Sequence, residues 1–286
     1  MIKKQEGFRI YEYVLFAGAT LLVFILCVSV GSVSVPLKDT ITIIWNSVWG
    51  IPIPKTITST SIILLVRLPR VICVALTGAS LSLCGGAMQG LLRNPLADGS
   101  TLGVSSGAAL GAAIAIAFGI TMPSLPFAGT MVMAIIFAFI SLIMILTLAY
   151  KMDFSLSTNT IILIGVIYSM FVSSILSLLI TFAPEKVKQI TFWTMGSLSG
   201  SNFDNALVLL SALVIFGGGI MLHARELNAF ATGEENALHI GVNVKRVKIL
   251  IMIFVSGLIG VCVSIGGSIG FIGLVTPHIV RMITGP

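Results

Sequence analysis

The chain consists mostly of long stretches without a charged residue, separated by short polar segments. A helix needs about 20 apolar residues to cross the hydrocarbon core of a membrane. Uncharged stretches of about that length therefore predict membrane-spanning helices. We expect seven spans, which lie within Tyr13–Leu37, Val71–Leu92, Gly99–Tyr150 (two spans), Phe154–Pro184, Asn205–Leu222 and Ile249–Gly266.

Two of these stretches are interrupted. The prolines Pro123 and Pro126 predict a turn between the two helices of Gly99–Tyr150. Glycines break the last stretch within Ser268–Gly273, and the apolar run from there to Arg281 is too short to cross alone. Irregular backbone at membrane depth is tolerated only inside protein or along a water-filled cavity. We therefore expect residues Ser268–Gly273 to lie inside the assembly and not against lipid.

Composition supports a polytopic membrane protein. Hydrophobic residues make up 57% of the 286 residues and charged residues 9%, against about 25% charged residues in ordinary soluble domains. The mean hydropathy is +1.11. These values exclude a soluble enzyme, a nucleic-acid-binding domain and a secreted disulfide scaffold. The four cysteines lie inside apolar runs and are interpreted as packing residues, so we expect no bound metal or cofactor.

The charges predict an orientation and a source of energy. Lys and Arg number 16 against 10 Asp and Glu, and most of the cations fall on the inner side if the N-terminus is cytoplasmic. The expected spans contain almost no ionisable residue, with His278 and Asp98 near their ends. Ion-coupled carriers usually place such residues inside the membrane. The energy for any transport is therefore expected to come from outside the membrane domain.

Small residues recur every four positions in three of the spans. This spacing places them on one helix face and lets backbones approach closely. We favour packing within the chain over a subunit interface. The residues are Gly78, Ser82, Gly86 and Gly90, then Gly103, Gly107, Gly111, Ala115 and Gly119, and more weakly Ser256, Gly260, Ser264 and Ser268.

Two cations stand at the outer start of the second span. Pro69 fits the first turn of a helix, and Arg67 and Arg70 are three residues apart and so share a face. A helix N-terminus disfavours cations, so some partner must offset that cost. The partner is either lipid phosphate, reached by snorkelling side chains, or an acidic protein on the outer side.

The most polar part of the chain is residues 223–248, on the inner side. Thr232 and Glu235 have the spacing of a capping box, with Thr232 as the N-cap. Gly241 can close this short helix, and Asn243 can cap the helix that follows. We expect a helix–turn–helix whose exposed Leu238 and Ile240 face a partner's groove, in preference to the alternative of a passive helix on the membrane surface.

Two other turns are less informative. Asn94 and Pro95 predict a tight turn at the inner face. On the outer side, Trp193 lies in an amphipathic segment that is either an interfacial anchor or a short helix over an outer vestibule.

Several motifs together closely resemble the permease subunits of type II ABC importers, the FecCD-type family for iron–siderophore, haem and cobalamin uptake. They appear in the order of the family over nearly the whole chain. The motifs are Arg67-Leu68-Pro69-Arg70, Met88-Gln89-Gly90, Asn94-Pro95-Leu96-Ala97, Leu102-Gly103-Val104-Ser105-Ser106-Gly107-Ala108, Trp193-Thr194-Met195-Gly196-Ser197-Leu198, Gly233-Glu234-Glu235-Asn236-Ala237 with Gly241-Val242, and Gly270 to Arg281.

The resemblance implies an all-α polytopic membrane protein, a dense helical bundle forming one permease domain over residues 1–286. Two departures accompany it. Gly99 stands where the family often has Pro. Family members have ten spans, so we expect about eight of the ten segments here and a C-terminally incomplete domain.

The resemblance also implies partners and site residues. Two permease subunits, identical or different, form a pathway lined by the fifth span, and two cytoplasmic ATPase subunits hold the coupling loop, residues 223–248. An extracytoplasmic binding protein delivers the substrate. The implied docking residues are Arg67 and Arg70, the implied ATPase contacts are Thr232, Gly233, Glu234, Glu235, Ala237, Gly241 and Val242, and Ser155, Ser157, Thr158 and Asn159 are candidates for an inner gate.

The function implied is transport of a ferric siderophore or related metal chelate across the cytoplasmic membrane, with haem or cobalamin as alternatives. ATP hydrolysis then takes place in the partner, so the chain is not expected to be an enzyme. The absence of a Gly-rich phosphate loop with Lys agrees with this. A secondary carrier and a membrane scaffold without transport remain as alternatives from other classes.

Overall fold

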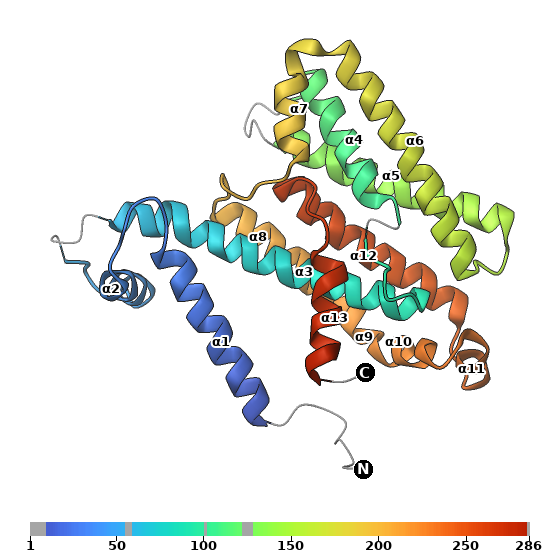
Figure 1. The fold of residues 1–286 in the computed structure, drawn as a ribbon, viewed down its shortest axis with the longest axis horizontal. Helices are drawn as coiled ribbons and strands as arrows, with labels where there is room; N and C mark the ends of the chain where they lie inside the picture. Colours follow the sequence, from blue (N-terminus) through green and yellow to red (C-terminus); the bar gives the residue numbers. More distant parts are fainter. Residues whose placement is uncertain (1–9, 55–58, 100–101, 122–127, 285–286) are drawn as a thin grey trace.

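The computed structural model describes residues 10–54, 59–99, 102–121 and 128–284, and every regular element in these ranges is a helix (Figure 1). The α-helices are α1 (Ile10–Ser29), α2 (Leu37–Val48), α3 (Leu68–Leu92), α4 (Val104–Ala117), α5 (Ala128–Met152), α6 (Thr158–Phe182), α7 (Val187–Thr194), α8 (Phe203–Ala212), α9 (Gly218–Leu222), α10 (Ala224–Ala231), α11 (Glu234–His239), α12 (Val244–Gly266) and α13 (Ile272–Thr284). Three short helices of other types connect them: η1 (Ile62–Arg67), η2 (Pro184–Lys186) and η3 (Leu213–Gly217).

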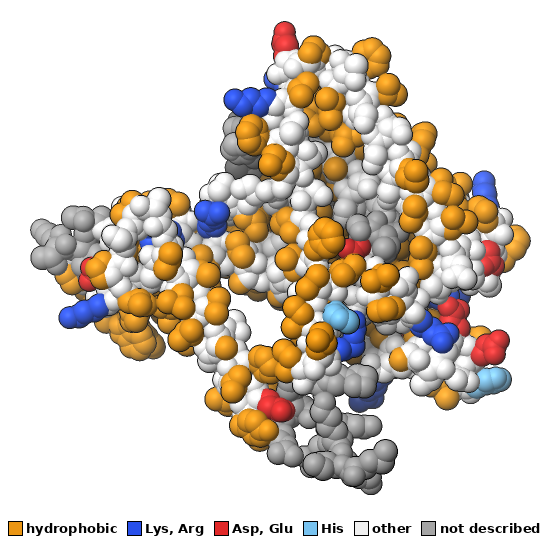
Figure 2. All heavy atoms as spheres, in the orientation of Figure 1, with side chains coloured by type: hydrophobic (Ala, Val, Ile, Leu, Met, Phe, Trp, Pro, Cys, Tyr) orange, Lys and Arg blue, Asp and Glu red, His pale blue; other side chains and the backbone are white. Residues whose placement is uncertain are grey.

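Six helical segments in the described residues are long and apolar enough to cross a membrane. They are Ile10–Ser29, Ile62–Leu92, Gly129–Met152, Thr158–Phe182, Phe203–Leu222 and Val244–Gly266. Each corresponds to a span that the sequence predicts. On the face shown in Figure 2, hydrophobic side chains are spread over the molecule and charged side chains are few. The all-α membrane fold is confirmed. The turn expected around Pro123 and Pro126 lies outside the described residues.

The prediction of a full third span is wrong, because α4 has only 14 residues. Gly103, just before α4, packs against the Gly165 carbonyl, seven residues into α6, which is about 10 Å along that helix. Gly99 packs against Ile259 in the middle of α12. Thus Gly99 and Gly103 already lie inside the bundle before α4 begins, and their lack of a side chain permits close approach to α12 and α6.

α12 forms the centre of the bundle. Most of it is buried, and it packs against α3, α4, α5 and α8. The glycine repeat of α4 packs internally, as favoured above: Gly107 lies against Ser141, and Gly111 lies against the Met133 carbonyl. The repeat of α3 behaves differently, since a Cβ on Gly78 or Gly90 would meet no described atom within 4 Å. The closest approach of α3 uses Gly85, outside the repeat.

The glycine-rich segment after α12 is only partly enclosed. Gly267, with a φ of +72°, packs against the Trp193 carbonyl of α7, and Gly273 packs against the α3 backbone. Ser268 and Phe271 are exposed. The described chain therefore buries only part of the segment, and its enclosure within the assembly stays a prediction. Trp193 lies on the short helix α7 and packs against the core. The choice between an interfacial anchor and a helix over an outer vestibule stays a prediction.

Candidate coupling site

The polar segment 223–248 folds into two short helices at one end of the bundle, beside the start of α12 (Figure 1). We call this the inner end. α10 ends at Thr232, whose hydroxyl donates to the Ala229 carbonyl at 2.8 Å. The N-cap of α11 is Gly233, with a φ of +122°. The predicted capping box with Thr232 as N-cap is therefore wrong, because the chain reverses at Gly233 and directs the Thr232 hydroxyl back toward α10.

The C-terminal end of α11 matches the prediction. Gly241 has a φ of +89°. Its N–H donates to the Leu238 carbonyl at 3.0 Å, and the Val242 N–H donates to the Ala237 carbonyl at 3.0 Å, the bonding pattern of a Schellman motif. The Asn243 side chain then accepts from the Arg246 N–H at 3.1 Å and caps α12. This turn fixes the direction of α11 relative to α12.

The outward face of α11 is free of contacts that would cover its apolar side chains. Leu238 is 57% exposed and Ile240 69% exposed, and Glu235 beside them is also exposed. Ala237 on the opposite face is fully buried. The helix is thus anchored on one side and presents apolar and acidic groups on the other, among the charged side chains at this end of the molecule (Figure 2).

Glu234 points into the protein, away from the outward face. Its Oε1 lies 2.8 Å from Lys248 Nζ and accepts from the Thr158 hydroxyl at 3.0 Å. Lys248 Nζ also donates to the Leu156 carbonyl at 2.9 Å. These four residues connect α11, α12 and the start of α6. We call them the Lys248 cluster, consisting of Leu156, Thr158, Glu234 and Lys248.

Lys248 was not predicted from the sequence, although a signal for it exists. It lies four residues after Val244 and three before Ile251, so it falls on the apolar face of α12. Its side chain is 0% exposed. Lys248 was instead included in the polar inner loop, residues 223–248. A lysine at apolar helical spacing predicts a buried and paired cation.

The proposed gate residues form a tight turn between α5 and α6. Asp153 accepts from the Ser155 hydroxyl at 2.6 Å, the Ser155 N–H at 2.8 Å and the Ser157 N–H at 3.0 Å. The Ser157 hydroxyl caps α6 by accepting from the Thr160 N–H. Ser155 and Ser157 thus stabilise the turn, whereas Asn159 is exposed. Of the four proposed gate residues, only Thr158 has a hydrogen bond to α11 in the described chain.

The Asp153 turn is expected to be insensitive to pH in the neutral range. Hydrogen bonds from Ser155 and Ser157 hold the pKa of the Asp153 carboxyl well below its usual range. A depressed folded pKa gives a stabilisation that is complete above the unfolded pKa of about 3.9 and is lost only as the pH falls further. Amide protection at Ser155 and Ser157, corrected for intrinsic exchange, should be constant from about pH 8 to 5. Asp153→Asn should lower it across that range, and protection that falls by pH 5 in the unmodified chain would contradict this account.

Arg67 and Arg70 do not present a common outer surface. Arg67 is 9% exposed, and its guanidinium donates to the carbonyls of Ser29 at 2.6 Å and Val28 at 3.2 Å, and to that of Val33. Arg70 is exposed. The helix also begins earlier than predicted, since η1 continues into α3. Arg67 is therefore bound to the C-terminal end of α1, where a helix dipole favours a cation, and it does not share an exposed face with Arg70. Docking of a binding protein at these residues stays a prediction.

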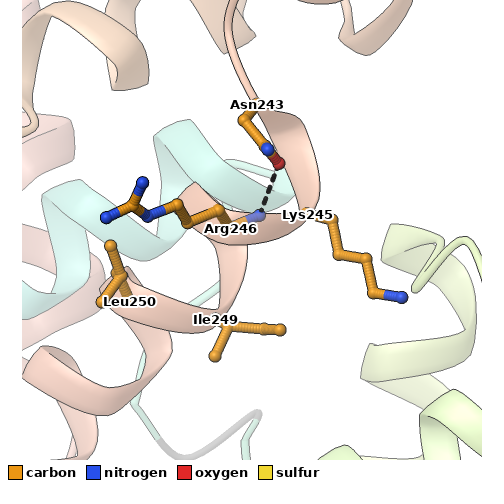
Figure 3. Close-up of a pocket in the computed structure, with 5 residues that line it drawn as sticks. All are labelled: Asn243, Lys245, Arg246, Ile249 and Leu250. Carbon is orange, nitrogen blue, oxygen red and sulfur yellow. Dashed lines mark hydrogen bonds between the residues drawn. The ribbon is translucent and has the colours of Figure 1, made fainter.

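A shallow depression beside the start of α12 is lined by Asn243, Lys245, Arg246, Ile249 and Leu250 (Figure 3). Lys245 and Arg246 point in opposite directions, and Lys245 Nζ lies 4.2 Å from the centre of the Tyr150 ring on α5. The polar groups do not converge on one point, as they do in most ligand pockets. We assign it no ligand.

Comparison with known proteins identifies relatives over almost the entire chain. The model of the FecCD transport family matches residues 19–286. The uncharacterized ABC transporter permease protein YvrB of Bacillus subtilis is 35% identical over 97% of this chain and 79% of its own length. A cobalamin import permease, BtuC of Halobacterium salinarum, is 37% identical over 77% of this chain, which spans 58% of that relative's length.

A solved structure has the same fold. It is described as an inward-facing conformation of a metal-chelate type ABC transporter, with a TM-score of 0.80, 31% identity, and coverage of 96% of this chain and 83% of that chain. Other matching permeases are named for hemin, iron chelatin and molybdate transport.

Proposed function

Because the chain belongs to the FecCD transport family, we propose that it is the membrane permease subunit of an ATP-driven importer for a ferric siderophore or related metal chelate. The proposal rests on the anchoring and exposure of α11, which we call the coupling helix. It is held by a positive-φ glycine on one side and by the buried Lys248 on the other, and it exposes Leu238 and Ile240 outward. Such a rigid element with an apolar outward face is suited to insertion into a partner's groove.

The substrate class is supported by the relatives taken together. The relatives are named for transport of iron chelatin, hemin, cobalamin and molybdate, and the solved neighbour is of metal-chelate type. Metal complexes with an organic ligand are the commonest among these. Haem and cobalamin therefore remain the alternatives to a ferric siderophore.

The proposed assembly contains two permease subunits, which form a pathway lined by α6, and two cytoplasmic ATPase subunits, which bind α11. A binding protein delivers the chelate at the opposite end, in contact with Arg70. The cytoplasmic membrane is the proposed location, with the N-terminus and α11 both on the cytoplasmic side. ATP hydrolysis in the partner supplies the energy, so this chain needs no cofactor of its own.

Uptake by whole cells tests the proposal. Cells that express a full-length permease containing this chain, together with its ATPase subunit and binding protein, should accumulate iron-55 from a labelled ferric siderophore, and unlabelled chelate should compete. Separate assays with haem and cobalamin distinguish the alternatives. ATP-independent uptake driven by a proton or sodium gradient would instead indicate a secondary carrier.

Gly241→Val is expected to abolish coupling while leaving the membrane helices intact. A Cβ at Gly241 meets no described atom within 4 Å, so its cost comes from the backbone at φ +89°. A β-branched residue in the left-handed region costs about 1–3 kcal/mol, which the exposed Schellman turn can relieve by shifting α11. We expect normal membrane abundance, reduced co-purification of the ATPase subunit and loss of uptake.

Gly241→Asn is the matched control, because asparagine adopts the left-handed region more readily than other non-glycine residues. It should retain most of the uptake. Equal activity of Gly241→Val and Gly241→Asn would show that the orientation of α11 does not matter for coupling.

A further inference from the structure

We infer that the Lys248 cluster is an internal latch that joins the coupling helix α11 to the inner end of α6, so that the two move as one unit. The inference rests on the proposed function, because it assigns the latch to the transmission of ATPase motion. Glu234, Thr158 and Lys248 act in it as positioning residues, and none of them needs to touch substrate or nucleotide.

The geometry of Glu234 carries the inference. One carboxylate oxygen, Oε1, is shared between Lys248 Nζ at 2.8 Å and the Thr158 hydroxyl at 3.0 Å. Thr158 is the first residue of α6 and Glu234 the first residue of α11. The two helix starts are therefore joined by a single charged hydrogen-bond acceptor, although they are 76 residues apart in the sequence.

The burial of Lys248 explains why this contact can hold the three segments in one relative position. The ammonium group is fully buried and has two oxygen partners in the structure, Glu234 Oε1 and the Leu156 carbonyl. A buried ion pair is often no more stabilising than well-packed apolar residues, whereas removal of one partner is costly. Its contribution here is best understood as fixing one relative position of three segments.

The turn that presents Leu156 is itself constrained. Leu156 has a φ of +53° with its side chain 1% exposed, and its N–H donates to the Asp153 carbonyl at 3.0 Å. A leucine in the left-handed region is uncommon and strained. Strain of this kind persists only where surrounding contacts hold it. Lys248 and Asp153 bind the turn from its two sides and supply those contacts.

The two adjacent glutamates at the start of α11, Glu234 and Glu235, have different roles in this proposal. Glu234 was expected to pair with basic groups on the ATPase, but its partners are internal. Glu235, the next residue, is exposed and is the one free to meet a partner. Force applied to the outward face of α11 thus reaches α6 through Glu234, without a conformational change in the intervening chain.

Distances between two nitroxide labels test the latch. The labels replace the exposed His239 on α11 and Phe154 in the turn before α6, in a background with Cys27→Ser. In the unmodified latch, the distance distribution should be narrow and equal in the chain alone, with the ATPase subunit bound, and with ATP trapped. Glu234→Gln and Thr158→Val should broaden or shift it, and Thr158→Ser should restore it, since serine keeps the hydroxyl. Asn228→Gln, an exposed change on the preceding helix α10, is the control.

Coupling supplies the second readout. In transporters reconstituted with labelled chelate, the latch variants should still bind the ATPase subunit and hydrolyse ATP, but chelate moved per ATP should fall about fivefold or more. Thr158→Val keeps the test meaningful if Glu234→Gln fails to fold. Unchanged distances and coupling in Thr158→Val would overturn the latch alone. Failure of the unmodified chain to bind the ATPase subunit would overturn the proposed function, and the distance measurement in the chain alone then still reports on the latch as a structural link.

Discussion

Gly85→Ala is expected to separate α13 from α3 and to destabilise the chain by about 1–3 kcal/mol, the usual cost of overpacking. A Cβ on Gly85 would lie 1.7 Å from the Gly273 carbonyl oxygen and 2.6 Å from the Gly273 Cα. Both are backbone atoms, so no side-chain rotation relieves the clash. The contact between Gln89 and α13, in which Gln89 donates to the Leu274 carbonyl at 3.2 Å and accepts from Arg281, should be lost as well. Thermal unfolding in detergent measures the effect.

Gly78→Ala on the same helix is the matched control. Its Cβ would meet no described atom within 4 Å, and alanine favours a helix over glycine by about 1 kcal/mol. The melting temperature should therefore stay constant or rise. Equal melting temperatures for the two variants would show that the close approach of Gly85 to Gly273 does not hold α13 in place.

Arg67→Ala should release α1 from the bundle. α1 is largely exposed along its length, and it contacts the bundle near its C-terminal end (Figure 1). There a small apolar cluster of Val28, Val35, Ile43 and Ile63 lies beside the Arg67 guanidinium. Removal of a buried charged donor that serves three carbonyls should cost about 2–3 kcal/mol. Faster proteolysis between α1 and α2, together with a lower melting temperature, checks the prediction.

Arg70→Ala is the matched change at an exposed arginine, and it should leave both measurements unchanged. If Arg70 contacts an acidic binding protein, Arg70→Glu should instead weaken docking and make it less sensitive to salt. A stability loss at Arg70 equal to that at Arg67 would contradict the division of roles between the two residues.

The membrane spans could be predicted because burial in lipid requires long uncharged helices. The prediction was wrong for α4 because it relied on the same criterion, a long uncharged stretch. The stretch Gly99–Thr121 is apolar and rich in glycine and alanine, so it has the composition of a full span. Gly99 and Gly103 instead lie before the helix, which begins at Val104, and they approach α12 and α6 inside the bundle. Hydropathy does not distinguish apolar helix from apolar loop at the same depth.

The functional side chains required tertiary contacts that no local pattern specifies. A cation near a helix start is costly, as the sequence predicted. The groups that offset this cost for Arg67 are the last carbonyls of α1 and the Val33 carbonyl just after it, 34 to 39 residues earlier in the chain. The capping box at Thr232 failed because the positive φ of Gly233 overrides the spacing. The role of Gly241 was predicted correctly, because a glycine just after a short helix commonly adopts the left-handed conformation that ends it.

The apolar outward face of α11 offers the most direct test of the account. A photocrosslinking amino acid at Leu238, in cells that also express the ATPase subunit, should form a covalent adduct with that subunit. The same probe at Phe182, exposed at the opposite end of α6, should not form it. Adducts with the ATPase subunit at Leu238 but not at Phe182 are the predicted result. Adducts of Leu238 with lipid alone would contradict the claim that this helix couples the permease to its ATPase.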